Sequence, residues 1–580
     1  MDRKTILAYI VIILIFLALP YYYKLITPQK QPSVVEQTQE GPSGDPSAAV
    51  LGAVDSTSQR ESGLEEEAAP PEYADATVLI SSSGFIRSER EDTVTVETPL
   101  MRMQFSTRGG VLIGCVLKKY AGQADGRVEL VQRGSRENLN LILFRGGDPV
   151  DLQSAAFQAD KPALMLAEAD ADSVVLTAST GDGALVRKIL KFSGSRYRFD
   201  LEVGTEGMKG LDPYYELHWG SGMAVTEVDT AQDLYYSKAF AYMGGELEKF
   251  DGKGDKELRG GAEGETRWVA QRRKYFEVVM LPTLKPANGV AFGIDPEPLR
   301  GKHRVKTFRM ALRMKGSLEQ QRDAFTIYCG PIDQKQLANV DPKLEETMNW
   351  GWAVIEPFSK LILWSLKGLH EFIPNYGLVL IVFSVLIKIV IWPLTHKSTR
   401  SMARMAAIQP KLKELQEKYK ANPEKLNKAM MQLYKEEGVN PFSGCWPTLL
   451  QMPLLYALFI IFRSTIELRG APFLFWIKDL SMPDVVAKLP FSIPMYGSEI
   501  AVLPIVMGFT QFLMSKVMIT DPKQKFTMYF MPIFMVLIFN NFPSGLTLYY
   551  ALFNLWTYLQ QMMLKKQGLL PASVGGATKV

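Results

Sequence analysis

The chain has 580 residues, of which 47% are hydrophobic and 22% are charged, and its formal net charge is only +4. This length allows several domains, and a charge so close to neutral gives no overall argument for a nucleic-acid-binding protein. The apolar residues are concentrated in a few segments. The composition therefore indicates a membrane protein with a soluble insert.

The cysteines and histidines do not indicate a metal or cofactor site. Cys115, Cys329 and Cys445 are far apart, and the four histidines are scattered along the chain. Zinc sites and disulfide frameworks show closely spaced ligands or pairs, so we expect three reduced cysteines and no bound metal. The sequence also has no G-x-x-x-x-G-K-[ST] phosphate loop, which argues against energy from a bound nucleotide. We expect no cofactor.

Residues 1–27 begin with a short basic stretch, continue with an apolar run from Ile6 to Leu19 and end in aromatic residues. This pattern is typical of a signal peptide or of a membrane anchor. We favour an uncleaved transmembrane anchor, because a small-x-small cleavage site is missing and "YYYKL" fits an aromatic belt at a membrane surface. Arg3 and Lys4 then place the N-terminus in the cytoplasm.

The next two segments differ sharply in composition. Residues 28–83 are rich in Pro, Gly, Ser and Glu with almost no aromatics, so they predict a disordered linker. Residues 84–335 contain segments such as "DTVTVETPLMRMQF", "YRFDLEVGT" and "DAFTIYCG", which alternate apolar with polar residues between Gly or Asp turns. This part predicts one large all-β sandwich outside the membrane.

Helical patterns replace strand patterns after Asp341. Residues 349–372 have apolar residues at helical spacing with charges between them, which predicts an amphipathic helix on the membrane surface. Five apolar segments follow within residues 377–564, and together with the anchor they predict an α-helical bundle of six spans. These segments are Gly377 to Leu394, Thr448 to Phe462, Ile500 to Val517, Met528 to Phe539 and Leu546 to Leu564.

An even number of spans places both chain termini on the same side of the membrane. With a cytoplasmic N-terminus, six spans put the C-terminus in the cytoplasm too, and the charges of the loops agree. The segment from His396 to Trp446 carries ten Lys or Arg, and the tail 565–580 begins with two lysines. Cytoplasmic loops of membrane proteins carry such an excess of positive charge. The sandwich then lies in the periplasm of a bacterium with two membranes.

Residues 397–437 have the pattern of a basic helical hairpin. Apolar residues recur every three or four positions, and the turn "ANPE" holds Pro423 where it can open the second helix. One interpretation is a docking surface for an acidic partner, such as ribosomal RNA or lipid head groups. The other is a solvated hairpin that only fixes topology. The candidate docking residues are Lys411, Lys413, Lys418, Lys425 and Lys428.

One charged residue, Lys388, lies inside the second span. A charge there costs about 2.5 to 3.5 kcal/mol on insertion scales, so it needs an escape to water or a use. Escape is possible, because the cytoplasmic end is about six residues or roughly 9 Å away and Lys can snorkel. However, Ser384 lies one turn before it, the last span has a polar stripe with Tyr550 and Asn554, and Gln511 lies in the fourth. We expect these polar residues to face each other around a wet cavity.

Two other classes of protein fit parts of the sequence. A membrane-anchored carbohydrate enzyme would use the sandwich and acids such as Glu216 and Glu277, but the sequence cannot place both in one cleft. A solute channel or transporter is expected to have paired charges within its spans or repeated halves. The sequence shows neither feature.

Three motifs resemble one known family, the YidC/Oxa/Alb membrane-protein insertases. "NPFSGCWPTLLQMP", from Asn440 to Pro453, fits the family signature N-P-x-x-G-C-x-P-x-x-x-Q-M-P. "FPSGLTLYYALFN" resembles the family's entry into the last span, and "ELRGAPF" resembles its outer loop. The resemblance extends over the whole chain, including the anchor, linker and large sandwich of Gram-negative members, and is strongest after Gly351.

The resemblance implies an insertase and chaperone, not an enzyme. Such a protein inserts membrane proteins into the bacterial inner membrane and helps them to fold, alone or with the Sec translocon. The implied partners are nascent membrane proteins, the ribosome, Sec translocon components and membrane lipids, with no specific nucleic-acid sequence.

The resemblance also implies a site. In the family, a positive residue five positions before the proline of "PLT" lies in a hydrophilic groove, and Lys388 has this position relative to Pro393. Most members carry Arg there, so Lys keeps the charge but lacks the bidentate fork. The residues expected to form the client-binding groove are Lys388, Ser384, Gln511, Tyr550 and Asn554.

Overall fold

The computed structural model describes residues 84–86, 91–122, 126–250, 258–298, 304–420, 422–438, 446–493, 496–518 and 525–566. They belong to two compact units, one that ends at Thr347 and one that resumes at Met348. The predicted anchor and linker lie outside the described residues, as do almost all of the tail and residues 440–445 of the first motif.

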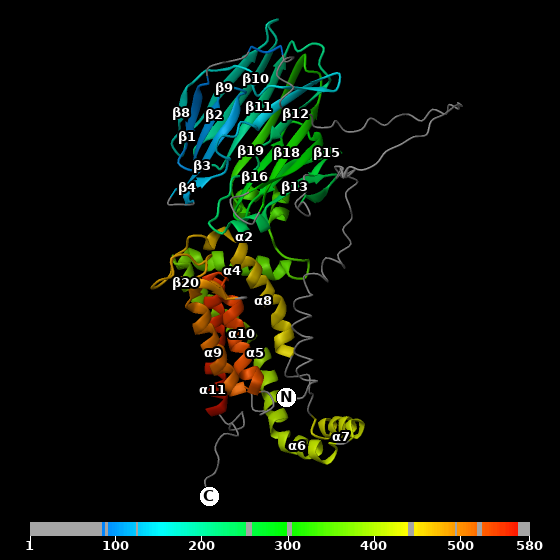
Figure 1. Cartoon of the computed structure of the whole chain (residues 1–580), viewed down its shortest axis with the longest axis vertical. Coiled ribbons are helices and arrows are strands. Elements are labelled where there is room, and N and C mark those ends of the chain that lie inside the picture. Colours follow the sequence, from blue (N-terminus) through cyan, green and yellow to red (C-terminus); the bar gives the residue numbers. More distant parts are fainter. Residues whose placement is uncertain are drawn as a thin grey trace, which may run out of the picture. The chain divides into compact units, whose positions relative to one another are not determined.

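Strand pairing arranges the first unit in two layers that meet at β15, whose two halves pair with β17 and with β16 (Figure 1). One layer holds β1 (Thr93–Glu97), β2 (Met101–Ser106), β3 (Val111–Ala121), β4 (Arg127–Glu129), β5 (Asn138–Arg145), β6 (Asp148–Asp151), β8 (Ala163–Met165), β12 (Tyr214–Trp219), β13 (Lys238–Met243), β14 (Glu246–Phe250), β15 (Leu258–Arg272), β17 (Ala287–Pro298) and β18 (Arg304–Lys315). The other holds β7 (Phe157–Ala159), β9 (Ala171–Ser179), β10 (Leu185–Ser193), β11 (Arg198–Glu206), β16 (Phe276–Pro282) and β19 (Gln320–Pro331). Neighbouring strands are antiparallel, apart from the parallel pair β1 and β8 among the described strands.

Side chains from the two layers meet in a shared core. The ring of Phe105 on β2 lies 6.0 Å from the rings of Phe192 on β10 and Phe199 on β11. The Tyr215 hydroxyl on β12 donates to Asp323 on β19 at 2.9 Å. Successive strand residues point to opposite faces, so the alternating patterns of the sequence supply one apolar face per strand. The predicted large β-sheet domain is confirmed.

A buried lysine forms hydrogen bonds to the turn between β2 and β3 and to β5. Lys188 on β10 is 1% exposed, and its Nζ donates to the carbonyl oxygens of Gly109 at 3.0 Å, Gly110 at 2.9 Å and Leu139 at 2.8 Å. Leu139 has a φ of 61°, which is unfavourable for a side chain with a Cβ. The three bonds therefore hold a backbone conformation that the local sequence does not favour.

We expect Lys188→Met to destabilise the sandwich by about 3 kcal/mol, because three buried carbonyls lose a charged donor. Lys191→Met is the matched control, since Lys191 lies on the same strand with a side chain 48% exposed and pairs with Glu202. We expect that change to cost less than about 0.5 kcal/mol. Urea titration of the detergent-solubilised chain, read by proteolysis of the sandwich, measures both. Equal midpoints for the two variants would contradict the assigned role.

Short helices extend this unit beyond residue 335, where the sequence patterns placed its end. They are α3 (Gln334–Ala338) and the 3-10 helix η2 (Pro342–Thr347), while a further short helix, α2 (Thr230–Tyr236), lies between β12 and β13. The Arg267 guanidinium binds Asp341 at 2.5 Å, and the Thr347 hydroxyl donates to the buried Glu277 carboxylate at 2.9 Å. These contacts join the segment up to Thr347 to the sandwich.

The second unit is mostly helical. Its elements are α4 (Glu356–Phe372), α5 (Tyr376–Ala407), α6 (Gln409–Lys418), α7 (Pro423–Glu436), α8 (Trp446–Ser464), the 3-10 helix η4 (Ile466–Leu468), the hairpin strands β20 (Val485–Ile493) and β21 (Gly497–Ala501), α9 (Leu503–Met518), α10 (Lys525–Phe539) and α11 (Ser544–Lys566). A helix therefore lies at each of the five apolar segments and at the predicted surface helix.

Helix α11 packs against both α5 and α9, α9 packs against α10, and α4 packs against α8 and α5. The contact of α9 with α10 is close at Gly508, where a Cβ would come within 2.4 Å of a Val536 side-chain carbon. Small residues permit such approaches between membrane helices. Helix α4 buries Ile362 and Leu366 but leaves Leu361 and Trp364 exposed, as expected of an amphipathic helix.

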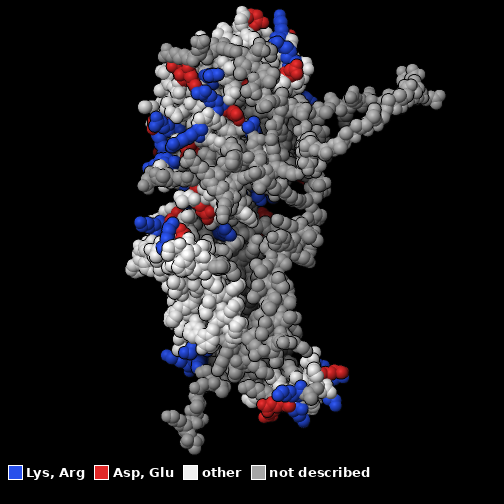
Figure 2. All heavy atoms as spheres, in the orientation of Figure 1, with Lys and Arg blue, Asp and Glu red and all other residues white. Residues whose placement is uncertain are grey.

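The structure does not confirm six spans. Among the described helices, one stretch, Tyr376–Pro393, is long and apolar enough to cross a membrane by itself. Met452–Ser464, Leu503–Val517 and Phe526–Phe539 are apolar but shorter. Figure 2 nevertheless shows a broad band without charged side chains over the described part of the bundle, with Lys and Arg gathered below it. The span number stays a prediction.

Candidate functional site

The candidate site lies where the middle of α5 meets α11. Ser384 and Lys388 are separated by one helical turn, so both face the same neighbour. Ser384 has no exposed surface and Lys388 is 7% exposed. The two residues therefore lie on one face of α5.

The Lys388 ammonium points at α11. Its Nζ donates to the Thr557 hydroxyl at 2.9 Å and lies 4.8 Å from the centre of the Phe553 ring. The Thr557 hydroxyl itself donates to the Phe553 carbonyl at 2.7 Å. Lys388 is therefore held by a neutral hydroxyl and an aromatic face.

This placement differs from that of a snorkelling lysine, whose ammonium would extend along its own helix toward water. Lys388 forms no ion pair with a carboxylate anywhere in the described ranges. An unpaired buried cation is costly, and it attracts an anion strongly when one arrives. Among the described residues, no carboxylate neutralises this positive centre.

Ser384 continues the same cluster. Its hydroxyl donates to the Ile381 carbonyl at 2.7 Å and accepts from the Trp556 indole N–H at 3.0 Å. Trp556 and Thr557 are neighbours on α11, so each contacts one of the two polar residues of α5. The hydrogen bonds from Lys388 to Thr557 and from Trp556 to Ser384 therefore join α5 to α11.

The other three predicted groove residues are less closely linked to Lys388. Asn554 is 8% exposed, one turn before Tyr558 on α11, and Tyr550 packs edge-on against Phe539 with ring centres 5.3 Å apart. Gln511 is half-buried on α9. Within the described residues, no hydrogen bond joins any of these three to Lys388. Tyr550 and Asn554 share α11 with the cluster and Gln511 lies on the neighbouring α9, but none of the three is an immediate partner of Lys388.

The sequence did not identify the two direct partners as site residues. Thr557 and Trp556 are not among the residues that the sequence indicated for the groove. A pattern within one helix cannot show which residue of another helix it meets. An indole N–H in a span was the available signal, because a buried Trp usually requires a hydrogen-bond acceptor.

The predicted hairpin is formed by α6 and α7, which begins at Pro423 after the capping residue Asn422. Ile408, Leu412 and Leu433 form its small core, and α5 continues as a helix to Ala407. Lys411 binds Glu437 at 2.5 Å and Lys428 binds Glu424 at 3.4 Å.

Two candidate lysines of the hairpin, Lys418 and Lys425, are exposed and form no ion pair within the described residues. The side chain of Lys413 lies outside the described part. An acidic partner would therefore meet Lys418 and Lys425 without having to break an existing pair.

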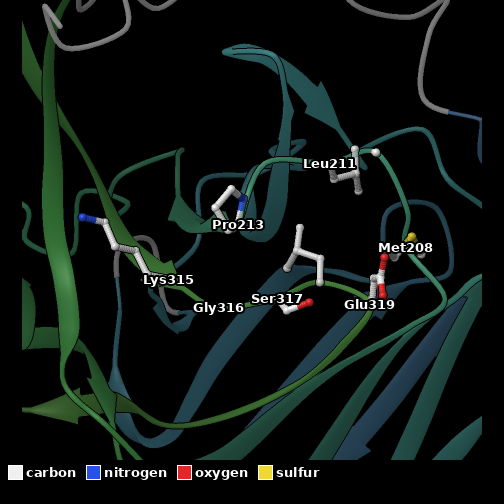
Figure 3. Close-up of a pocket in the computed structure, with 9 residues that line it drawn as sticks. Met208, Leu211, Pro213, Lys315, Gly316, Ser317 and Glu319 are labelled. Carbon is white, nitrogen blue, oxygen red and sulfur yellow. The ribbon is translucent and has the colours of Figure 1, made fainter.

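The sandwich also has a pocket, of about 430 Å³, between the segment before β12 and the turn between β18 and β19 (Figure 3). Glu319 is the acidic residue of its lining, which otherwise is largely glycine and apolar side chains with Lys315. Glu216 and Glu277 do not line it. Glu216 is held by Arg313 at 2.9 Å, and burial raises the pKa of Glu277 to about 7.

The acids named for a carbohydrate enzyme are thus buried, at 3% and 0% exposure, and apart from this pocket. The described residues also contain no cluster of His, Cys, Asp and Glu suited to a metal ion. The geometry gives no support for either kind of chemistry.

Comparison with known proteins identifies the family. Residues 93–365 match the YidC periplasmic domain, and residues 368–569 match the family described as 60Kd inner membrane protein. The membrane protein insertase YidC of Chlorobium phaeovibrioides is 34% identical over 576 residues, covering 97% of this chain and 94% of the relative. The chain belongs to the YidC family of membrane protein insertases. YidC of Chloroherpeton thalassium is 33% identical, covering 98% and 96% of the two chains.

A crystal structure described as active YidC insertase with the first transmembrane domain resolved is 19% identical, with a TM-score of 0.34, and covers 83% of this chain and 93% of its own. The assignment to the YidC family rests on the family matches and the relatives, not on this structural likeness. This protein is a non-enzymatic membrane protein insertase of the inner membrane, with a β-sheet periplasmic domain and a helical membrane core. The resemblance in the sequence motifs is confirmed.

Proposed function

We propose that this YidC-family insertase binds its clients at the cluster on α5 and α11, in a hydrophilic groove formed by Lys388, Ser384, Gln511, Tyr550 and Asn554. The observation that carries the proposal is the buried Lys388 ammonium, which binds the Thr557 hydroxyl and no described carboxylate. A positive centre inside a membrane bundle attracts a negative or polar client segment. Thr557 and Trp556 are added to the site as residues that position Lys388 and Ser384.

The mechanism follows from the cost of moving charge through hydrocarbon. A client with a short acidic outer segment faces that cost over the full membrane, and a wet groove that reaches part-way shortens the path. Lys388 then stabilises the acidic segment at the deepest point. The apolar part of the client leaves sideways into lipid, where its transfer is favourable.

The proposed topology has six spans, with both termini in the cytoplasm. It includes residues 1–27 as the anchor, 28–83 as a linker, 84–335 as the sandwich, 349–372 as the surface helix, 377–564 as the five-span core and 565–580 as a tail. The positive loop 396–446 and the uncharged band of the bundle support it. Exposed Leu361 and Trp364 on α4 fit a helix lying at the membrane surface.

The proposed partners are nascent membrane proteins, ribosomes at the hairpin 397–437, membrane lipids and components of the Sec translocon. The exposed lysines of the hairpin support ribosomal RNA as its ligand, because phosphates attract basic side chains. The insertase would help clients to fold as well as to enter the membrane, alone or with the translocon. The alternative for the hairpin is a role in topology only.

Photo-crosslinking tests the site. A crosslinking residue at Tyr550 or Asn554 on α11 should label a ribosome-bound client in mid-insertion, whereas one at Ile533 on α10, whose side chain is 62% exposed, should label it far less. The two helices belong to the same bundle, so expression and assembly are matched. Equal labelling from all three positions would contradict a defined groove on α11.

A further inference from the structure

Two cysteines far apart in the sequence come together inside the sandwich. Cys115 lies on β3 and Cys329 on β19, and neither side chain has any exposed surface. The two strands belong to different layers, because Cys115 pairs with Met103 of β2 and Cys329 pairs with Val278 of β16. Both cysteines are free thiols in the structure.

The Cys115 thiol has the Cys329 thiol as its interacting neighbour in the core. The surrounding contacts independently place β3 against β19 and its neighbours. The Tyr120 ring of β3 lies 5.3 Å from the Phe276 ring and 6.3 Å from the Tyr197 ring. The Cys329 N–H, in turn, donates to the Tyr197 carbonyl at 2.9 Å. The two thiols therefore lie where the two layers pack closely against each other.

A metal site would need further ligands, and the described residues contain no suitable cluster. Glu129 is the neighbouring acid, and its carboxylate accepts from the Cys115 backbone N–H at 2.7 Å. The neighbouring Cys329 thiol and burial together raise the pKa of the Cys115 thiol, which disfavours the reactive thiolate in the folded protein.

The periplasm provides the oxidising environment that disulfide formation requires. The sandwich is the periplasmic domain, and disulfides form and persist in the bacterial periplasm. Two neighbouring cysteines in an oxidising compartment can form a disulfide, whereas the sequence suggested cysteines too far apart to do so. The expectation that all three cysteines are reduced was based on spacing along the chain, which does not report contacts between layers.

We propose that Cys115 and Cys329 form an intramolecular disulfide that links the two layers of the periplasmic sandwich. The oxidant is an external disulfide of a protein or small thiol. One cysteine thiolate attacks that disulfide and releases one external thiol, and the second cysteine then attacks the mixed disulfide and releases the other. Two cysteine thiols are thereby oxidised, while one external disulfide is reduced to two thiols.

The order of events follows from burial. Neither sulfur is accessible once the layers have closed, so the exchange takes place before the core is complete. The finished bond is shielded from reductants for the same reason. A disulfide that closes a long loop restricts the unfolded chain, so the oxidised sandwich should unfold at a higher denaturant concentration than the reduced one.

Thiol counting in the full chain tests the bond. Cells are quenched in acid, the protein is unfolded in detergent, and free thiols are tagged with a maleimide that adds mass. The wild-type chain has three cysteines. We expect one tag before reduction, on Cys445, and three after it. Cys115→Ser and Cys329→Ser should each carry two tags both before and after reduction.

The electrophoretic size without reductant completes the test. A monomer with one tag supports the proposal, and cells grown with a membrane-permeant reductant should give three tags. Three tags from untreated cells would overturn it. Two tags would show bonding to an outside thiol, and a disulfide-linked dimer would show bonding between copies, so either result would also overturn it. None of these outcomes depends on insertion activity.

Discussion

Lys388→Glu is expected to abolish most insertion of a client with an acidic outer segment, by a factor of about one hundred. Lys388→Ala is expected to reduce it about tenfold, and Lys388→Arg should retain activity. At an effective dielectric constant of 20, two charges 4 Å apart interact by about 4 kcal/mol, which is enough to support these factors. Protection of the client's outer segment from protease in vesicles measures the rate.

A control at a second lysine distinguishes the position of Lys388 from the mere loss of a positive charge. Lys516 lies exposed in the last turn of α9, so Lys516→Ala removes the same charge from the bundle without touching the cluster on α5 and α11. Its insertion rate should equal that of the parent. If Lys388 only snorkelled, Lys388→Ala would be equally harmless, because it removes a costly charge from a span.

Reversal of two hairpin charges, Lys418→Glu with Lys425→Glu, is expected to weaken ribosome binding at least about tenfold at moderate salt. Both side chains are exposed and form no described ion pair, so the change adds repulsion toward phosphates without breaking a described ion pair. Co-sedimentation of ribosomes with insertase vesicles over a series of salt concentrations measures the loss, and the slope with salt should become shallower.

The control exchanges a pair that exists in the structure. Lys411→Glu with Glu437→Lys keeps the net charge and can re-form the bond between the two residues, so ribosome binding should change little. Deletion from Lys411 to Lys435 should impair insertion while the bundle still assembles. Unchanged binding by the double reversal would leave the hairpin as a topology signal only.

Local patterns in the sequence predicted the elements well. The segments around Val94 and Val203 are strands with alternate burial, because period-two alternation leaves little choice once one face is covered. The two helices on either side of Asn422 likewise follow from apolar spacing and from a capping residue before Pro423. These features depend on neighbours within a few residues.

Contacts between distant elements could not be predicted in the same way. Lys388 and Thr557 are 169 residues apart, and Ser384 and Trp556 are 172 apart, so only the packing of α5 on α11 brings them together. Cys115 and Cys329 meet for a similar reason, because two layers close over each other. Hydropathy predicted six spans, and the structure leaves that number unconfirmed, since apolar helices such as Phe526–Phe539 are short.

A double comparison of Lys388 with its client tests the electrostatic groove most directly. One client is prepared with its acidic outer residues intact and with them neutralised, and each form is inserted by the parent, Lys388→Ala and Lys388→Glu. The proposed groove predicts a loss of about tenfold or more for the acidic client and little loss for the neutral one, which is a coupling near 1.4 kcal/mol or above. If Lys388→Glu inserted the acidic client as fast as the parent, attraction by Lys388 would not be the mechanism of this insertase.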